Sequence, residues 1–293
     1  MKLVTTNIQG NIFTSEILER IRTEDIRYQK PVDFKLKPSE YIRDEISNGW
    51  SQLNTQWSFF KRKREALDEA DTGVSETRKY WMRHFFYLLG YDISLANTKS
   101  VNSKSYAISH EVSNKDGFPI HIVGCNQSLD KRHENGVRTR LSPHALMQEY
   151  INCTEYLYGY ITNGLYLRVL RDTTQLSKLS YMEFNLEQMM EEGHYNEFAL
   201  LYRLLHATRI TDNKDNIENS YLEFYHNEAI ASGMRIRERL SDAFYESILL
   251  LSNGFLRHNS NIDLRTQISQ GNITSKTFYA QILKVAYRLL FLS

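Results

Sequence analysis

The spacing of apolar residues along the chain predicts helices first. Apolar residues recur at alternating offsets of four and three, as on one face of a helix, at Ile46, Trp50, Leu53, Trp57 and Phe60. We expect this helix to have Pro38 in its first turn and to end near Gly73. A second periodic stretch predicts a helix from Ser75 to Leu89, closed by Gly90 as a left-handed residue.

Between residues 106 and 172 the apolar positions take the period of two that is typical of strands. The pattern predicts strands over 107–109 and 119–123, a helix over 142–152, and a further strand over 180–184. Asn163 and Gly164 separate two strand-like runs and predict a hairpin. Because both residues tolerate positive φ, we expect a type I′ turn.

Beyond residue 198 the helical period returns and continues to the last residues of the sequence. The polar run 211–216 is predicted to be a linker. Three regions follow: an N-terminal helical segment over 1–74, an α/β domain over 75–210 and a helical connector over 211–293. The fold class is α/β (α+β), with a central mixed sheet flanked by helices and followed by an all-helical region.

Composition and charge narrow the class of protein. The chain has 293 residues, of which 41% are hydrophobic and 24% charged, so it can bury a sizeable core. No apolar run approaches the roughly 20 residues of a membrane span, and the first residues lack a signal pattern, so we expect a cytoplasmic protein and no membrane partner. Two cysteines without metal-ligand spacing are expected to be reduced thiols. A net charge of +1 leaves DNA contact to local basic patches.

The order helix, strand, strand, helix, hairpin resembles the PD-(D/E)XK restriction-endonuclease fold. The block QEYINCTEYLYGYITNGLYLRVLRD at 148–172 is similar to one in the nuclease-like N-terminal region of large adenine-specific DNA methyltransferases, Type IIG-like proteins of restriction-modification and phage defence. The resemblance covers residues 75–293, with 220–254 and 277–292 similar to the connector that leads into the methyltransferase domain. It implies double-stranded DNA as a partner, a methyltransferase domain beyond Ser293, and S-adenosylmethionine as a cofactor of that parent protein.

An active nuclease of that fold needs an acid on one strand and a D/E-x-K motif on the next, because the carboxylates hold the divalent metal that activates water. The second strand reads IHIVGC over 120–125 and offers neither an acid nor a lysine. Glu111, Asp130 and Gln148 are the candidate catalytic residues, although a lone glutamate at a strand end is more often a surface residue. We therefore expect a degenerate site, with Mg²⁺ as the cofactor of a divergent nuclease.

Methyltransferase chemistry is not expected in this chain itself. An adenine methylase needs a proline-proline-tyrosine loop to hold the flipped base. The chain has four prolines, and none is adjacent to another. It has no GxGxxG loop, HExxH motif or GxSxG motif, so nucleotide binding, zinc-protease and serine-hydrolase activities have no support. No cofactor is predicted for this chain beyond the Mg²⁺ of the nuclease alternative.

Three basic clusters are candidate phosphate contacts, although each is also what an ordinary solvated surface contains. They are Lys61, Arg62, Lys63 and Arg64; Lys131, Arg132, Arg138 and Arg140; and Arg235, Arg237 and Arg239. The sequence therefore favours a DNA-interacting accessory region without a working metal site. A divergent magnesium-dependent endonuclease using Glu111 and Asp130 is the alternative from the enzyme class. A module that only mediates protein contacts is the third interpretation.

Overall fold

A computed structural model describes residues 3–132, 141–172 and 180–292. The chain divides into two compact units, which we call the core unit (residues 1–230) and the helical unit (residues 231–293). The division falls inside one long helix, α8 (Tyr221–Arg257), and not at the predicted boundary near residue 211. Each unit is described by itself.

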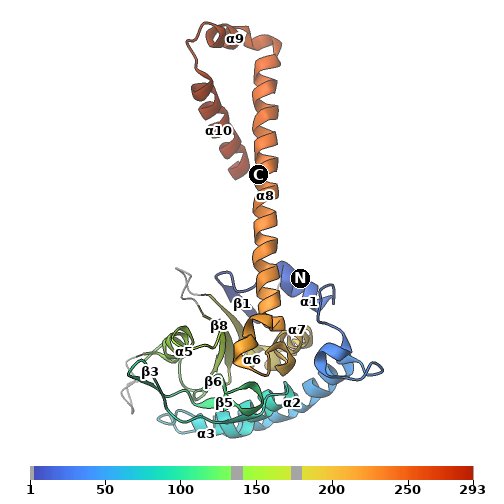
Figure 1. Ribbon diagram of the computed structural model, residues 1–293, viewed down its shortest axis with the longest axis vertical. Coiled ribbons are helices and arrows are strands. Elements are labelled where there is room, and N and C mark those ends of the chain that lie inside the picture. The colour runs from blue at the N-terminus through green and yellow to red at the C-terminus, as the bar shows by residue number, and fades with distance from the viewer. Residues whose placement is uncertain (1–2, 133–140, 173–179, 293) are drawn as a thin grey trace. The chain divides into compact units, whose positions relative to one another are not determined.

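A seven-stranded mixed sheet forms the centre of the core unit (Figure 1). Its strands, in sheet order, are β1 (Thr6–Gln9), β9 (Tyr181–Asn185), β8 (Tyr166–Arg171), β7 (Tyr158–Thr162), β6 (Phe118–Ile122), β5 (His110–Val112) and β2 (Ile93–Leu95). β6 and β7 are parallel, and all other neighbours in this sheet are antiparallel. β3 (Lys99–Val101) and β4 (Lys104–Tyr106) form a separate two-stranded sheet. The predicted mixed α/β class is confirmed.

Helices flank the sheet on both faces (Figure 1). They are α1 (Ser15–Arg22), α2 (Ile42–Glu65), α3 (Val74–Glu76), the π-helix η2 (Thr77–Met82), α4 (Arg83–Leu88), α5 (Pro143–Asn152), α6 (Leu186–Glu191) and α7 (Tyr195–Leu205). Short 3₁₀ turns are η1 (Pro31–Phe34), η3 (Ser113–Lys115), η4 (Ala207–Arg209) and η5 (Lys214–Asn219). α2 begins at Ile42, later than predicted, because Tyr41 before it is in an extended conformation.

The two faces of the sheet carry different cores. α5 lies over one face, where Met147 and Ile151 pack with Ile161 and Leu170. The larger core covers the opposite face and unites α2, α4 and α7 with inward residues such as Tyr160. Because both faces are covered, all residues of β6 and β7 are buried, so apolar and polar residues need not alternate along these strands.

The predicted hairpin forms, but its turn differs from the predicted one. The N–H of Asn163 donates to the carbonyl of Tyr166 at 3.3 Å, so the central residues are Gly164 and Leu165. Only Gly164 has positive φ (+83°), which fits a type II′ turn and contradicts type I′. The Asn163 side chain accepts from the N–H groups of Leu165 and Tyr166. This use of Asn163 as an acceptor explains the shift of the turn by one residue.

The helical unit contains the C-terminal part of α8, the short turn η6 (Asn259–Asn261), α9 (Ile262–Ser269) and α10 (Ser275–Leu292). Ile248, Ile282 and Ala286 form its buried cluster, with a few half-buried neighbours. No helix among the described residues is both long enough and apolar enough to cross a membrane.

Candidate functional site

The corner at which β5 and β6 meet η2 is where the predicted nuclease site belongs, and its polar groups are Arg78, Ser109, His110 and His121. The Ser109 hydroxyl accepts from the N–H of Ile122 at 2.7 Å and lies 2.8 Å from Nδ1 of His110. The Ser109 N–H donates to Nδ1 of His121 at 3.2 Å. The Arg78 guanidinium donates twice to the carbonyl of Ile122, at 2.7 and 3.0 Å.

The chemistry of this corner is that of neutral imidazoles beside a fixed cation. Burial, with the charge of Arg78 adding to it, lowers the pKa of His110 and of His121 to about 4. Both rings are therefore uncharged near neutral pH. Mg²⁺ takes oxygen ligands in octahedral geometry. Two imidazoles, one hydroxyl and a guanidinium do not fit that ion, and no group of three or more metal-ligating side chains occurs among the described residues.

The structure does not bring Glu111 and Asp130 together. Glu111 pairs with Lys99 at 2.7 Å, at the β5 end of the sheet. Asp130 is held by both terminal nitrogens of Arg168 in β8, at 2.6 and 2.8 Å. β5 and β8 are three strand spacings apart, or about 14 Å at ~4.8 Å per spacing. The two carboxylates are thus bound to different cations, and the described residues contain no group of metal-ligating side chains that joins them.

Gln148, the third candidate, is a buried residue of α5. Its side-chain amide donates to the carbonyl of Arg171 at 2.9 Å and to Asn152 at 2.8 Å. Its carbonyl oxygen has no hydrogen-bond partner among the described residues. These contacts attach α5 to the end of β8, a structural role that does not require a substrate.

A surface of cations interleaved with aromatic rings lies where α2 meets η2. We call this the basic–aromatic patch: Phe59, Arg62, Lys63, Lys79 and Tyr80. The rings of Phe59 and Tyr80 meet edge to face at 5.3 Å. Lys63 lies over both rings, 5.6 Å from Phe59 and 5.7 Å from Tyr80, while Arg62 lies over Phe59 and Lys79 over Tyr80. The cation–π contacts orient these side chains while leaving their charged groups in solvent.

The predicted run Lys61–Arg64 separates into two pairs with different surroundings. Lys61 bonds Glu191 at 2.7 Å and Arg64 bonds Glu187 at 2.5 Å, so their charges are neutralised by α6. Arg62 and Lys63, on the other side of α2, are exposed and form no ion pair with any described residue. Only this second pair remains available for an anion. Sequence reasoning did not include Lys79 and Tyr80 in this surface.

The other predicted DNA contacts stay predictions. Lys131 and Arg132 are exposed at the end of the described segment. Arg138 and Arg140 lie outside the described residues. Arg235 and Arg237 are exposed on α8, in the helical unit.

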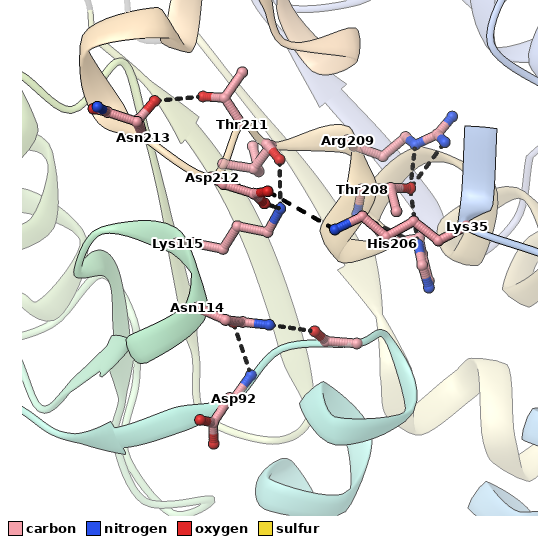
Figure 2. A network of polar contacts seen from close by, with 12 residues as sticks. Lys35, Asp92, Asn114, Lys115, His206, Thr208, Arg209, Thr211, Asp212 and Asn213 are labelled. Atoms are coloured by element: carbon pink, nitrogen blue, oxygen red, sulfur yellow. Dashed lines mark hydrogen bonds and ion pairs between the residues drawn. The ribbon is translucent and has the colours of Figure 1, made fainter. Parts of the chain in front are cut away.

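A second polar cluster, around Lys115, lines a cavity of about 530 Å³ in the core unit (Figure 2). The buried Lys115 ammonium donates to the carbonyl of Ile210 at 2.8 Å and to Asp212 at 2.6 Å. Burial lowers the pKa of Lys115, although Asp212 opposes this. Arg209 donates to the carbonyls of Tyr28 and Asp33, both at 2.5 Å. These cations serve internal acceptors, so the cluster anchors the segment predicted as a linker to the core unit.

Comparison with known proteins adds no assignment: no protein-family model, no curated protein and no solved structure matches this chain. The resemblance to nuclease-like regions of adenine methyltransferases therefore remains a prediction from the sequence.

Proposed function

We propose that this chain is a DNA-contacting accessory region of a restriction-modification adenine methyltransferase. In this proposal it binds the duplex backbone without cleaving it and positions a methyltransferase domain that is not part of the sequence. The carrying observation is the basic–aromatic patch, because Arg62, Lys63 and Lys79 are exposed cations, held in place by two rings and without ion-pair partners among the described residues.

The position of the patch supports this function over a structural one. Lys61 and Arg64, on the other side of the same helix, each lie beside a carboxylate of α6. The neighbouring cations that lack such a carboxylate repel one another, a cost that phosphate oxygens would relieve. Contacts of this type position a protein on DNA and carry no sequence information. We therefore expect salt-dependent binding without a preferred site.

The absence of cleavage in this proposal rests on the corner at β5 and β6. Its residues do not suit Mg²⁺, and both candidate carboxylates are occupied by protein cations. No catalytic step is assigned to any residue of this chain. The nuclease alternative would require Glu111 and Asp130 to leave their partners and move toward each other.

Binding to a fluorescent duplex, measured by anisotropy over a series of salt concentrations, tests the proposal. Replacing Arg62, Lys63 and Lys79 by alanine removes three phosphate contacts and should flatten the slope of log K against log salt by about 2.7, at ~0.9 per contact. The control replaces three exposed cations of α10, Lys276, Lys284 and Arg288, by alanine, and changes the net charge equally. We expect the control to keep most of the slope.

Chelation and cleavage assays provide the second arm. Binding should persist in EDTA and should not be strengthened by magnesium, since the proposal involves no metal ion and Mg²⁺ competes for phosphate as a counterion. Plasmid should stay intact with magnesium or manganese. Cleavage that is lost in Glu111→Ala would establish the nuclease alternative. Undetectable binding at low salt would favour a module that only contacts protein.

A further inference from the structure

The helical unit buries little of its apolar surface. Its buried cluster has three members, Ile248, Ile282 and Ala286. Eleven large apolar side chains of the same unit are 40–74% exposed. They are Met234, Ile236, Leu240, Tyr245, Leu249, Leu250, Phe255, Ile262, Tyr279, Tyr287 and Leu289. Exposed apolar surface of this density marks an interaction site.

One face of α8 concentrates this surface in a regular line. We call it the seam: Ile236, Leu240, Ala243, Ser247 and Leu250, at offsets of four, three, four and three. All five residues are exposed. Residues 240, 243, 247 and 250 also line a groove of about 480 Å³ beside α10. Small side chains in the middle of the seam allow a second helix to approach closely, as in a coiled coil.

A charged stripe runs beside the seam, one residue earlier at each step: Arg235, Arg239, Asp242 and Glu246. All four residues are exposed, and none forms an ion pair with a described residue. The two arginines are four residues apart, and so are the two carboxylates. Like charges at this spacing destabilise a helix on its own. Arg239 and Asp242, three residues apart, carry opposite charges but form no ion pair. All four charges of the stripe are therefore open to partners on another molecule.

We propose that a second copy of this chain covers the seam, with the two α8 helices antiparallel about a two-fold axis between Leu240 and Ser241. A two-fold axis at that point sets Arg235 opposite Glu246 of the second copy and Arg239 opposite Asp242. The axis repeats both pairs, so four ion pairs flank the seams. Every unpartnered charge of the stripe then meets its opposite, a self-complementarity that a two-fold interface requires.

The area is adequate for a dimer. The seam side chains, with Met234 and Leu289, contribute on the order of 500 Å² of apolar surface per copy, at roughly 100 Å² for each large half-exposed side chain. A standard interface buries approximately 800 Å² per partner, so the charged stripe and the adjoining edge of α10 have to supply the remainder. DNA suits this face less well, because two carboxylates cancel the two arginines and the seam itself is apolar.

Charge reversal in the full chain tests the pairing, with mass measured by light scattering after size exclusion. We expect the wild type to be a dimer at about 100 μM. Arg235→Glu with Arg239→Glu, and separately Asp242→Arg with Glu246→Arg, should each raise the dimer Kd at least about 100-fold, because like charges then face one another. Mixing the two variants should restore a dimer containing one copy of each.

Controls separate the pairing from loss of fold. Lys276→Glu with Lys284→Glu makes the same change in net charge as the arginine variant, on exposed residues of α10, and should stay dimeric. Circular dichroism should give the same helicity for every variant. The proposal is overturned if the wild type is a monomer at the highest concentration, or if the mixed variants do not associate. A monomeric wild type whose DNA affinity falls with Arg235→Glu and Arg239→Glu would assign the stripe to nucleic acid instead.

Discussion

Replacing Arg168 by methionine tests how a buried cation holds β8, β9 and the segment around Asp130 together. The guanidinium is 7% exposed and bonds Asp130 twice and Glu183 at 2.5 Å. It also lies 3.1 Å from Nδ1 of His144 and 4.8 Å from the ring centre of Tyr181. Methionine keeps most of the side-chain volume and removes all of these polar contacts.

The two carboxylates contribute unequally to the expected loss. Asp130 is 64% exposed, so water replaces Arg168 there at a cost below about 1 kcal/mol. Glu183 is 16% exposed and is left in the sheet without its cation. Breaking a buried pair costs about 3–5 kcal/mol, and the partial exposure of Glu183 places the loss for Arg168→Met near 3 kcal/mol.

Urea unfolding followed by circular dichroism measures this difference. Adding Glu183→Gln to Arg168→Met removes the unpaired charge and should recover about half of the loss. Asp130→Asn alone should cost below about 1 kcal/mol. A loss under about 1 kcal/mol for Arg168→Met, or no recovery in the double variant, would refute the assignment of the cost to Glu183.

The pH dependence of the stability gives a separate measure of the ion pair between Arg168 and Asp130. The hydrogen bonds and charge of Arg168 lower the pKa of Asp130, against the effect of burial. A lowered carboxyl pKa stabilises the fold fully above the unfolded value of about 3.9, and this contribution disappears as pH falls through the folded pKa. The difference in stability between wild type and Asp130→Asn should therefore vanish in acid. A difference that persists there would mean that Asp130 acts through something other than its charge.

Two further predictions concern the turn at Gly164 and the buried histidines. Gly164→Ala should destabilise the fold by more than about 2 kcal/mol, since the residue has φ +83° and a Cβ would lie 2.8 Å from Thr77; Gly193→Ala, with φ +72° and open space around it, should cost only about 1 kcal/mol. Equal losses in urea unfolding would contradict the steric argument. Burial lowers the pKa of His110, His121 and His144 to about 4 and of His206 to about 3, so the unfolded chain binds more protons below about pH 6.5. Stability should fall from pH 6.5 toward pH 4, by up to about 1.4 kcal/mol per pH unit for each histidine, and a flat profile over this range would contradict these lowered values.

Local sequence signals were sufficient to predict those helices and strands whose residues carry a clear periodic pattern, cap or turn. α5 and the β7–β8 hairpin occur where the sequence predicts them, because a Ser142 cap and a glycine turn are local signals. The apolar stripe also predicts α2, but this helix spans Ile42–Glu65 and is shorter at both ends than the expected one, which had Pro38 in its first turn and ended near Gly73. The strand predicted over 107–109 is displaced to β5 (His110–Val112). β1 was not predicted at all. Its partner β9 lies far along the chain, and no local signal specifies such a pairing.

Buried charged residues are the second feature that the sequence did not predict, because a hydrophobic pattern places charged residues in solvent. Arg209 is fully buried and donates to carbonyls of the first 36 residues. Glu197 is also buried and accepts from Val4, Thr5 and Thr6, which fixes β1 in place. These long-range contacts explain why the first 36 residues, which the sequence predicts as part of a helical segment over 1–74, lie in the core unit.

The basic–aromatic patch could be predicted only in part for a geometric reason. The run Lys61–Arg64 was visible, but which of its members have carboxylate partners depends on α6, more than a hundred residues later. Lys79 and Tyr80 joined the patch through the π-helix η2, whose wider turn changes the direction of side chains relative to an α-helix. A regular helical period over 75–89 does not reveal this change.

The same π-helix connects the corner at β5 and β6 with the patch. Arg78 points inward to the end of β6, while the adjacent Lys79 and Tyr80 face outward in the patch. On the proposed function, carboxylates without a metal ion at a surface that faces DNA would repel phosphate, so a corner without such carboxylates favours binding in the absence of Mg²⁺. Neutral histidines and Arg78 at the corner are compatible with binding in EDTA through the neighbouring patch. DNA affinity that needs magnesium would contradict this reasoning, even if no cleavage occurred.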